Sequence, residues 1–173
     1  MRAGDQFGAI RMLRKAQKTV LLDGNNILHL GMDNQVGTTA LELVILLMRQ
    51  QPQQIVCFFD ANIYYRLHEN GDIAPKARFS VSLLEEIFDL RCHEIYVVPS
   101  STDADKYIIE TLQRLRNARI VTNDRYRDYH ALYPRLKDQR QWRKGVSIRG
   151  NRMFVHGHKA PLVLTRTGAR AVS

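Results

Sequence analysis

The sequence contains four short apolar runs, each followed by turn-forming residues and then by a segment with helical periodicity. The runs lie in residues 19–26 (TVLLDGNN), 54–62 (QIVCFFDAN), 94–103 (EIYVVPSSTD) and 119–125 (RIVTNDR). Short strands that alternate with helix-length segments predict βαβ units and a parallel sheet. Because the runs are nearly continuous in Val, Ile, Leu and Phe, helices are expected to cover both faces of that sheet.

The segments between and after these runs complete the expected fold. A leading helix is expected over residues 7–17, and residues 145–157 (GVSIRGNRMFVHG) alternate around a central Gly-Asn, which predicts a β-hairpin. The chain of 173 residues is 45% hydrophobic, which fits one domain with a real core. The expected fold class is therefore α/β, a single domain with a mostly parallel central sheet flanked by helices and a C-terminal β-hairpin. The intervening helices are expected over residues 38–50, 80–90 and 104–117.

Several function classes are disfavoured by simple features of the sequence. The two cysteines, Cys57 and Cys92, cannot form a CxxC-type zinc site or a disulfide framework, so we expect a reducing, cytoplasmic setting without a signal peptide. The longest apolar stretch, residues 40–48, is too short for a membrane span and contains Glu42, so no membrane partner is expected. Neither GxxxxGK[ST] nor GxGxxG occurs, so no nucleotide cofactor is expected.

The positive charge of the chain is concentrated in its last quarter. From Arg125 onward there are twelve Lys and Arg residues and two acids, Asp128 and Asp138, whereas the preceding residues carry fourteen bases and fifteen acids. A basic block on an otherwise balanced domain indicates a polyanionic partner such as nucleic acid. A solvated tail is the alternative, favoured for the last ten residues. The expected phosphate contacts are Arg125, Arg127, Arg140, Arg143, Lys144, Arg149 and Arg152.

Trp142, the single tryptophan of the chain, lies within the basic block. It is either a platform on which an unpaired base stacks or, as we favour, part of the core.

Acidic residues follow each of the four apolar runs. Parallel strands end at one edge of a sheet, which is where ligands bind in open α/β folds. Any single one of these acids is explained equally well as a helix cap or a turn residue. Together they form an all-oxygen site, which suits Mg²⁺ or Mn²⁺. The acids are Asp23, Asp60, Asp103, Asp105, Asp124 and Asp128.

The last two acids are four residues apart. If Asp124 opens a helix, Asp124 and Asp128 project from one face, and a cation between them relieves their repulsion. His156 and His158 are better explained by a surface loop than by metal binding. Carboxylate-held divalent ions beside a basic surface suit phosphodiester hydrolysis, because they activate a water and neutralise the leaving oxygen.

Three segments resemble the acidic motifs of the NYN branch of PIN-like ribonucleases, and most closely those of the Regnase type. They are VLLDGNNIL (20–28), DADKYIIETL (103–112) and VTNDRYRDY (121–129), within a similarity that spans residues 19–156. The CCCH zinc finger of the vertebrate Regnase enzymes is absent here. The resemblance divides the chain into an N-terminal helical extension (1–18), an NYN/PIN-like nuclease domain (19–160) and a basic tail (161–173).

The resemblance also implies roles for individual residues. Asp23, Asp105, Asp124 and Asp128 would be metal ligands, and Asn26 would hold the metal water or a phosphate. The Regnase type carries adjacent acids in its second motif, whereas here Asp103 and Asp105 are separated by an alanine. Residues i and i+2 of a helix point in different directions, so we favour Asp105 as the ligand and Asp103 as a helix cap or outer ligand.

The expected function is thus a Mg²⁺- or Mn²⁺-dependent ribonuclease that hydrolyses single-stranded or looped RNA. Endonucleolytic cutting is implied by the family only. The alternatives are a catalytically inactive RNA-binding module, a carboxylate–metal phosphatase, and a protein-interaction domain that uses the apolar helix at 38–50. That helix and the resemblance are also compatible with a homodimer.

Overall fold

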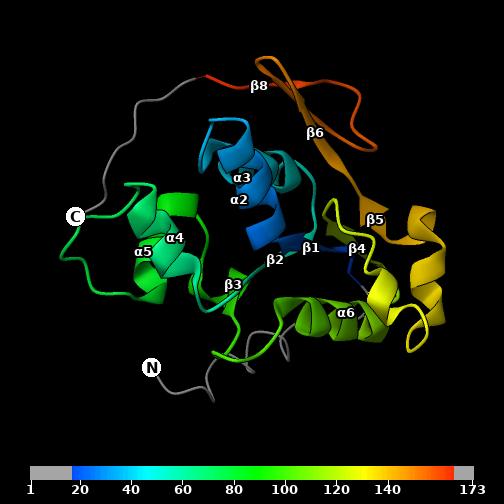
Figure 1. Ribbon diagram of the computed structural model, residues 1–173. Helices are drawn as coiled ribbons and strands as arrows, with labels where there is room; N and C mark the ends of the chain where they lie inside the picture. Colours follow the sequence, from blue (N-terminus) through cyan, green and yellow to red (C-terminus); the bar gives the residue numbers. More distant parts are fainter. Residues whose placement is uncertain (1–16, 166–173) are drawn as a thin grey trace.

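The computed structural model describes residues 17–165 (Figure 1). The leading helix expected over 7–17 lies outside these residues except for its last position, and residues 166–173 of the expected basic tail also lie outside them. Among the described residues, no helix combines the length and the apolar character that crossing a membrane requires.

The centre of the fold is a five-stranded sheet in the order β3-β2-β1-β4-β5. All four strand pairs are parallel, which confirms the predicted sheet. β1 lies in the middle, and all five of its residues are buried. The strands are β1 (Thr19–Asp23), β2 (Gln54–Phe59), β3 (Ile95–Val97), β4 (Ala118–Val121) and β5 (Arg143–Lys144).

Helices cover both faces of this sheet, as expected for a parallel sheet. α2 and α3 lie on one face and α6 lies on the other (Figure 1). α3, α5 and α6 correspond to the three expected helices. The helices are α2 (Gly24–Asp33), α3 (Thr39–Arg49), α4 (Ile63–Glu69), α5 (Val81–Phe88) and α6 (Ala104–Arg114). Four 3₁₀-helices, η1 (Cys92–Glu94), η2 (Arg127–Tyr129), η3 (Pro134–Lys137) and η4 (Gln139–Gln141), complete the connections.

Helix α2 was not expected, because its sequence, GNNILHLGMD, is rich in Gly and Asn, which are poor helix formers. Two tertiary features stabilise it. The Asp23 side chain caps the helix by accepting a hydrogen bond from the Asn26 N–H. Gly24 lets the helix start directly against β2: a Cβ there would lie 2.6 Å from Cε1 of Phe59 and 2.7 Å from the carbonyl oxygen of Phe58.

The sheet separates two apolar cores. One lies on the α2/α3 face and also contains residues of the C-terminal hairpin, and the other lies on the α6 face. Trp142 belongs to the second core: it is fully buried, and its Nε1 donates a hydrogen bond of 3.1 Å to the Leu136 carbonyl. Its ring stacks on Tyr126 at a centroid distance of 5.5 Å. This confirms the structural interpretation of Trp142.

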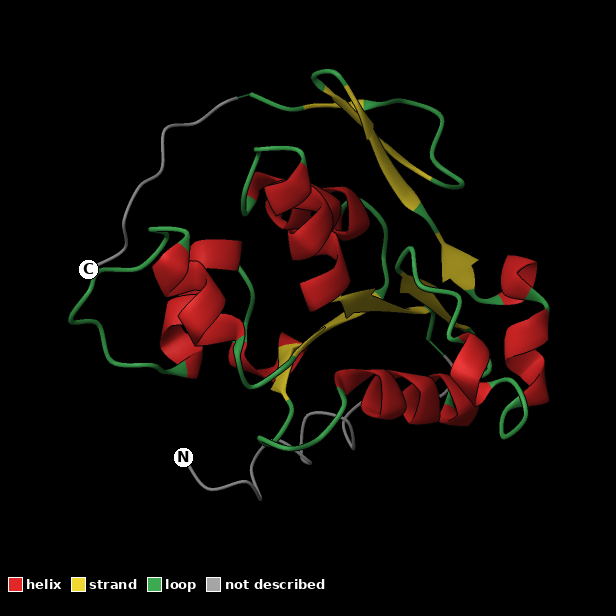
Figure 2. Cartoon of the chain, viewed as in Figure 1, coloured by secondary structure: helices red, strands yellow, loops and turns green. Residues whose placement is uncertain are grey.

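A second, antiparallel sheet contains the predicted hairpin (Figure 2). Arg149 pairs with Arg152 across the turn, and Gly150 has a φ of 59°, which favours glycine. The third strand was not expected. Beyond it, Leu164 is buried and its N–H donates to the Asn151 carbonyl at 2.8 Å. The strands are β6 (Val146–Arg149), β7 (Arg152–Val155) and β8 (Leu162–Val163).

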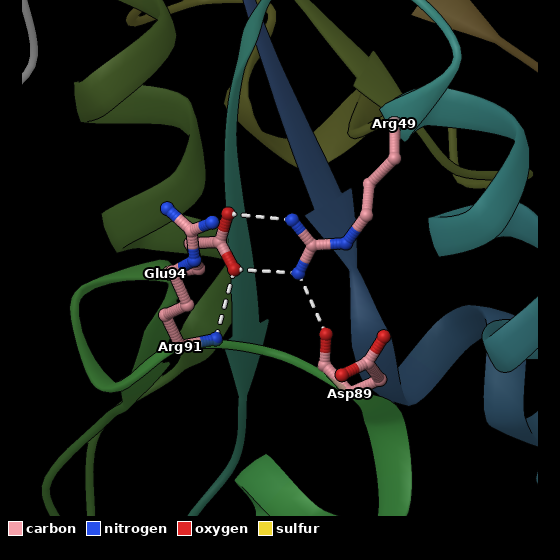
Figure 3. A network of polar contacts seen from close by, with 4 residues as sticks. All are labelled: Arg49, Asp89, Arg91 and Glu94. Carbon is pink, nitrogen blue, oxygen red and sulfur yellow. Dashed lines mark hydrogen bonds and ion pairs between the residues drawn. The ribbon is translucent and has the colours of Figure 1, made fainter.

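An ion-pair network joins α3 to the segment that leads into β3 (Figure 3). The guanidinium of Arg49 donates to Oε1 of Glu94 at 3.1 Å and to Oε2 at 2.8 Å. It also donates to the Asp89 carbonyl, and the Arg91 N–H donates to Glu94 at 2.8 Å. Burial of Glu94 opposes its ionisation, but the hydrogen bonds from Arg49 and Arg91 outweigh burial and lower the pKa of Glu94.

Candidate active site

Asp23 is the most firmly held acid at the carboxyl edge of the sheet. It ends β1 and is only 7% exposed. One oxygen, Oδ1, accepts the Asn26 N–H at 3.2 Å, and the other, Oδ2, accepts the hydroxyls of Thr122 and Tyr126 at 2.8 Å each. Burial raises the pKa of Asp23, and these hydrogen bonds oppose that rise. The three hydrogen bonds hold the carboxylate in one orientation.

Tyr126 remains a hydrogen-bond donor to this carboxylate. Burial, and then the charges of Asp23 and Asp105, raise the pKa of Tyr126 well above its ordinary value. The phenol consequently stays protonated at neutral pH. Tyr126 is buried, and its hydrogen bond to Asp23 had no signal in the sequence.

Asp105 lies in the first turn of α6, beside Asp23 and Asp124. Asp103 caps the same helix by accepting the Asp105 N–H at 2.9 Å, as predicted. Burial, followed by repulsion from Asp23, Asp103, Asp124 and Asp60, raises the pKa of Asp105 to about 7. The negative charge of these acids at the sheet edge thus exceeds the positive charge that the protein places beside them.

Asp124 lies in the loop after β4 and is tied to its neighbours on both sides. Its Oδ1 accepts the Tyr126 N–H at 2.6 Å, and its own N–H donates to the Thr122 hydroxyl at 3.0 Å. The preceding residue, Asn123, donates its N–H to Oδ1 of Asn26 at 2.8 Å. The loop after β4 is therefore bonded directly to α2.

The helix expected to begin at Asp124 does not form, so the geometry predicted for the Asp124–Asp128 pair is wrong. Tyr126 adopts a left-handed conformation with a φ of 48°, and the chain then enters η2. The buried ring of Tyr126, anchored to Asp23, accounts for this turn. Asp128 is exposed and lies outside the group of acids that line the pocket described next.

These acids surround a small pocket of about 210 Å³. Asp60 belongs to it: its Oδ2 accepts Nδ2 of Asn25 at 2.8 Å, and its N–H donates to Oδ1 of Asn25 at 3.0 Å. Asp60 also accepts the Ala104 N–H at 3.3 Å, which links β2, α2 and α6. The acidic pocket is lined by Asp23, Asn25, Asn26, His29, Asp60, Arg66, Ala104, Asp105 and Asp124.

Thr122 and Asn25 are site residues that the sequence reasoning missed. Both lie inside the motifs already identified, Asn25 in DGNN and Thr122 in VTND. The sequence feature that could have identified them as site residues is their position directly beside the motif acids. Polar residues next to a buried carboxylate commonly supply its hydrogen bonds.

The expected phosphate contacts line more than one cavity. Arg140 and Arg143 line a cavity beside the hairpin, whereas Lys144 lines a separate cavity with Lys18 and Arg119. The other expected phosphate contacts, Arg125, Arg127, Arg149 and Arg152, are exposed.

The donor set of the acidic pocket suits a divalent cation. Its carboxylates and side-chain amides offer oxygen atoms as ligands, and burial followed by repulsion between the carboxylates raises the pKa of Asp105. Within residues 17–165, however, no three acidic, histidine or cysteine side chains converge closely enough to ligate one ion together. Mg²⁺ commonly keeps several waters and contacts one or two carboxylates. The residues present therefore fit an ion held partly through water.

A parallel α/β sheet with acids at its carboxyl edge is the arrangement expected for a PIN-like nuclease domain. The chain belongs to the Zc3h12a-like ribonuclease NYN domain family, whose model matches residues 16–158. This confirms the resemblance inferred from the three motifs. No curated protein matches the chain significantly.

A solved structure with a similar fold is the nuclear proteinaceous RNase P 2 (PRORP2) from A. thaliana. The TM-score is 0.62 at 16% identity, over 98% of this chain and 34% of that one. The chain thus spans about a third of the length of that protein, and at this identity the similarity shows the fold alone. It confirms the α/β class predicted from the sequence.

Proposed function

We propose that this protein is a Mg²⁺- or Mn²⁺-dependent ribonuclease that cuts phosphodiester bonds within single-stranded or looped RNA. The observation that carries the proposal is that Asp23, Asp105 and Asp124, from three separate segments, line one pocket, in which burial and then the neighbouring carboxylates raise the pKa of Asp105 to about 7. Membership of a ribonuclease family supports the reaction class.

Asp23, Asp105 and Asp124 would hold the cation, directly or through water. When bound, a divalent ion lowers the pKa of a water and stabilises charge on the phosphate oxygens. Oδ1 of Asp23 accepts one hydrogen bond and keeps a free lone pair, whereas Oδ2 already accepts two. Oδ1 is therefore the oxygen through which Asp23 would hold a cation. Asp103 and Asp128, which lie outside the pocket, act at most as outer-sphere partners.

Other residues would bind and orient the RNA. Arg66 lines the acidic pocket and places a positive charge where the scissile phosphate must approach. Asn26 holds the loop that carries Asp124, because its Oδ1 accepts the Asn123 N–H. The flanking phosphates are bound by the basic residues predicted from the sequence, Arg125, Arg127, Arg140, Arg143, Lys144, Arg149 and Arg152.

A non-catalytic RNA-binding module is the second candidate, and one observation favours it. Asp23 already accepts three hydrogen bonds, and no trio of metal-binding side chains converges among the described residues. Acids that serve only as helix caps and hydrogen-bond acceptors would show the same arrangement as this pocket. In that case the protein binds RNA with a marked salt dependence but never cleaves it.

The deciding experiment incubates the purified protein with an end-labelled single-stranded RNA in Mn²⁺, Mg²⁺ or chelator. Asp124→Asn removes one charge from the pocket, and Glu86→Gln, at an exposed position of α5, is the matched control. We expect metal-dependent internal cuts by the wild type and Glu86→Gln, and at least a hundredfold slower cutting by Asp124→Asn.

RNA binding without cleavage in every metal would replace the nuclease proposal with the binding module. Turnover of nucleoside monophosphates without cutting of RNA would instead support a phosphatase. The cytoplasmic location and a homodimer also remain proposals. Unpaired Cys57 and Cys92 agree with a reducing compartment, and light scattering tests the oligomeric state.

A further inference from the structure

The C-terminal hairpin borders a second cavity, here named the hairpin pocket, with a volume of about 670 Å³. This volume falls within the range of pockets that hold small organic ligands. The pocket is adjacent to the acidic pocket, because Asn123 lines one and Asp124 lines the other. Asn123 also ties the two together: its side chain exchanges hydrogen bonds of 2.7 and 2.8 Å with the backbone of Val146.

Arg143 gives the hairpin pocket a cation without a protein partner. Its buried Nε has no hydrogen-bond partner, and Arg143 makes no ion pair, within residues 17–165. Burial, followed by repulsion from Arg125, lowers the pKa of Arg143, and attraction to Asp124 opposes that change. A partly buried guanidinium with a free Nε is stabilised by an anion, and its planar fork matches a phosphate group.

Gly145 lets the Arg143 guanidinium lie close to the backbone. A Cβ at this position would lie 3.3 Å from Nη1 of Arg143 and 3.4 Å from Oδ1 of Asn123, which is a tight contact. A larger residue would therefore push against the side chains of Arg143 and Asn123.

The hairpin pocket is also lined by groups suited to a base. The Phe154 side chain lines the pocket, and this residue is 38% exposed, while the Arg149 guanidinium lies 5.8 Å from its ring centroid. Exposed aromatic rings beside cations are the stacking platforms of single-strand binders. Nε2 of His158, another lining residue, is buried and has no partner in the described part of the chain.

His158 can hydrogen-bond a base edge as a neutral ring. Burial, and then the charge of Lys144, lower the pKa of His158, so its imidazole is neutral at physiological pH. A neutral imidazole nitrogen either donates or accepts, depending on the tautomer. Partner atoms on a nucleobase satisfy either form.

We propose that the hairpin pocket binds one unpaired nucleotide of the RNA next to the cleaved bond, with its phosphate on Arg143 and its base stacked on Phe154. This inference rests on the proposed function, because it deepens the substrate class of the same site. A base inside a duplex cannot reach Phe154 while it stays paired. The pocket therefore restricts cutting to unpaired RNA.

The test measures binding apart from cleavage, by fluorescence anisotropy of a short fluorescein-labelled single-stranded RNA in chelator. Phe154→Ala removes the platform, and Phe79→Ala is the matched control because Phe79 is an exposed ring remote from the hairpin pocket. We expect at least about fivefold weaker binding for Phe154→Ala and unchanged binding for Phe79→Ala. Both variants should bind a blunt RNA duplex as the wild type does.

Arg143→Gln provides a second, independent measurement. We expect weaker binding of the same RNA and a salt dependence reduced by about one phosphate contact. Thermal melting of each variant shows whether it is folded. Phe154 is exposed on β7, so its replacement leaves the cores intact even if Arg143→Gln proves unstable.

If wild type, Phe154→Ala and Phe79→Ala bind the single-stranded RNA with equal affinity, the proposal that the hairpin pocket binds a nucleotide is wrong. Equal losses of affinity for single-stranded and duplex RNA in Phe154→Ala also overturn it, because stacking on an unpaired base would then not be the cause. A wild type that binds no RNA overturns it as well. The proposed nuclease activity is judged separately by the cleavage assay with Asp124→Asn, so the two failures are distinguishable.

Discussion

Replacing Asp105 with asparagine should stabilise the metal-free protein, although it removes a carboxylate that we propose holds the cation. The pKa of Asp105 in the folded protein is about 7, against an ordinary value of 3.8, because of burial and then the neighbouring carboxylates. Between these two values the folded state binds more protons than the unfolded state. The contribution of Asp105 to stability is therefore fully present below about pH 4 and is lost as the pH rises to about 7.

The size of this effect on stability follows from the difference of roughly 3 pH units between the folded and ordinary pKa values of Asp105. At about 1.36 kcal/mol per unit, the upper limit is roughly 4 kcal/mol. Asp105 is only half-buried, so solvent screening reduces the expected value to about 1–2 kcal/mol. For a chain of this length, that corresponds to a rise in Tm of roughly 2–8 °C.

The assay is thermal unfolding in chelator at about pH 5 and about pH 8, followed by circular dichroism. We expect Asp105→Asn to melt above the wild type at the higher pH, with a smaller difference at the lower pH. Adding Mg²⁺ or Mn²⁺ should raise the Tm of the wild type more than that of the variant, because the cation binds the charged site. A variant that is no more stable than the wild type at about pH 8 would refute the argument from accumulated charge.

Three further substitutions test other contacts. Tyr126→Phe removes a hydrogen bond to buried Asp23, so we expect a loss of about 1–2 kcal/mol in stability and slower RNA cleavage, measured by denaturant unfolding and the cleavage assay. Gly24→Ala places a methyl group against the Phe58 carbonyl and should cost about 1–3 kcal/mol in the same unfolding experiment. Glu94→Gln should cost about 1–3 kcal/mol at neutral pH. Because the pKa of Glu94 is lowered, its contribution is present above its ordinary value of 4.5 and lost as the pH falls, so melting curves should converge in acid.

The sequence predicted the parallel sheet and its acidic edge because both depend on local patterns. Apolar runs formed β1 to β4, and four of the six acids that follow them, Asp23, Asp60, Asp105 and Asp124, line one pocket, as the shared direction of parallel strands requires. The cap of α6 was also predictable, since Asp103 precedes the helix directly. These features need only neighbouring residues to be recognised.

The features that were missed depend on contacts between distant residues. The turn at Tyr126 reflects a hydrogen bond to Asp23 across 103 positions, and it overrides the helical spacing of Asp124 and Asp128. Helix α2 forms despite weak propensity because Asp23 caps it and β2 packs against it. Strand β5 has only two residues and therefore no periodicity to detect.

The third strand of the hairpin sheet has a practical consequence for anyone who expresses a shortened form of this protein. The family match ends at residue 158, but β8 pairs with β7 beyond that point, and buried Leu164 lies further on. A fragment cut at 158 would leave β7 as an open edge and uncover apolar surface, which promotes association between chains. A fragment extended past Leu164 keeps that edge closed and should remain monodisperse for longer in storage.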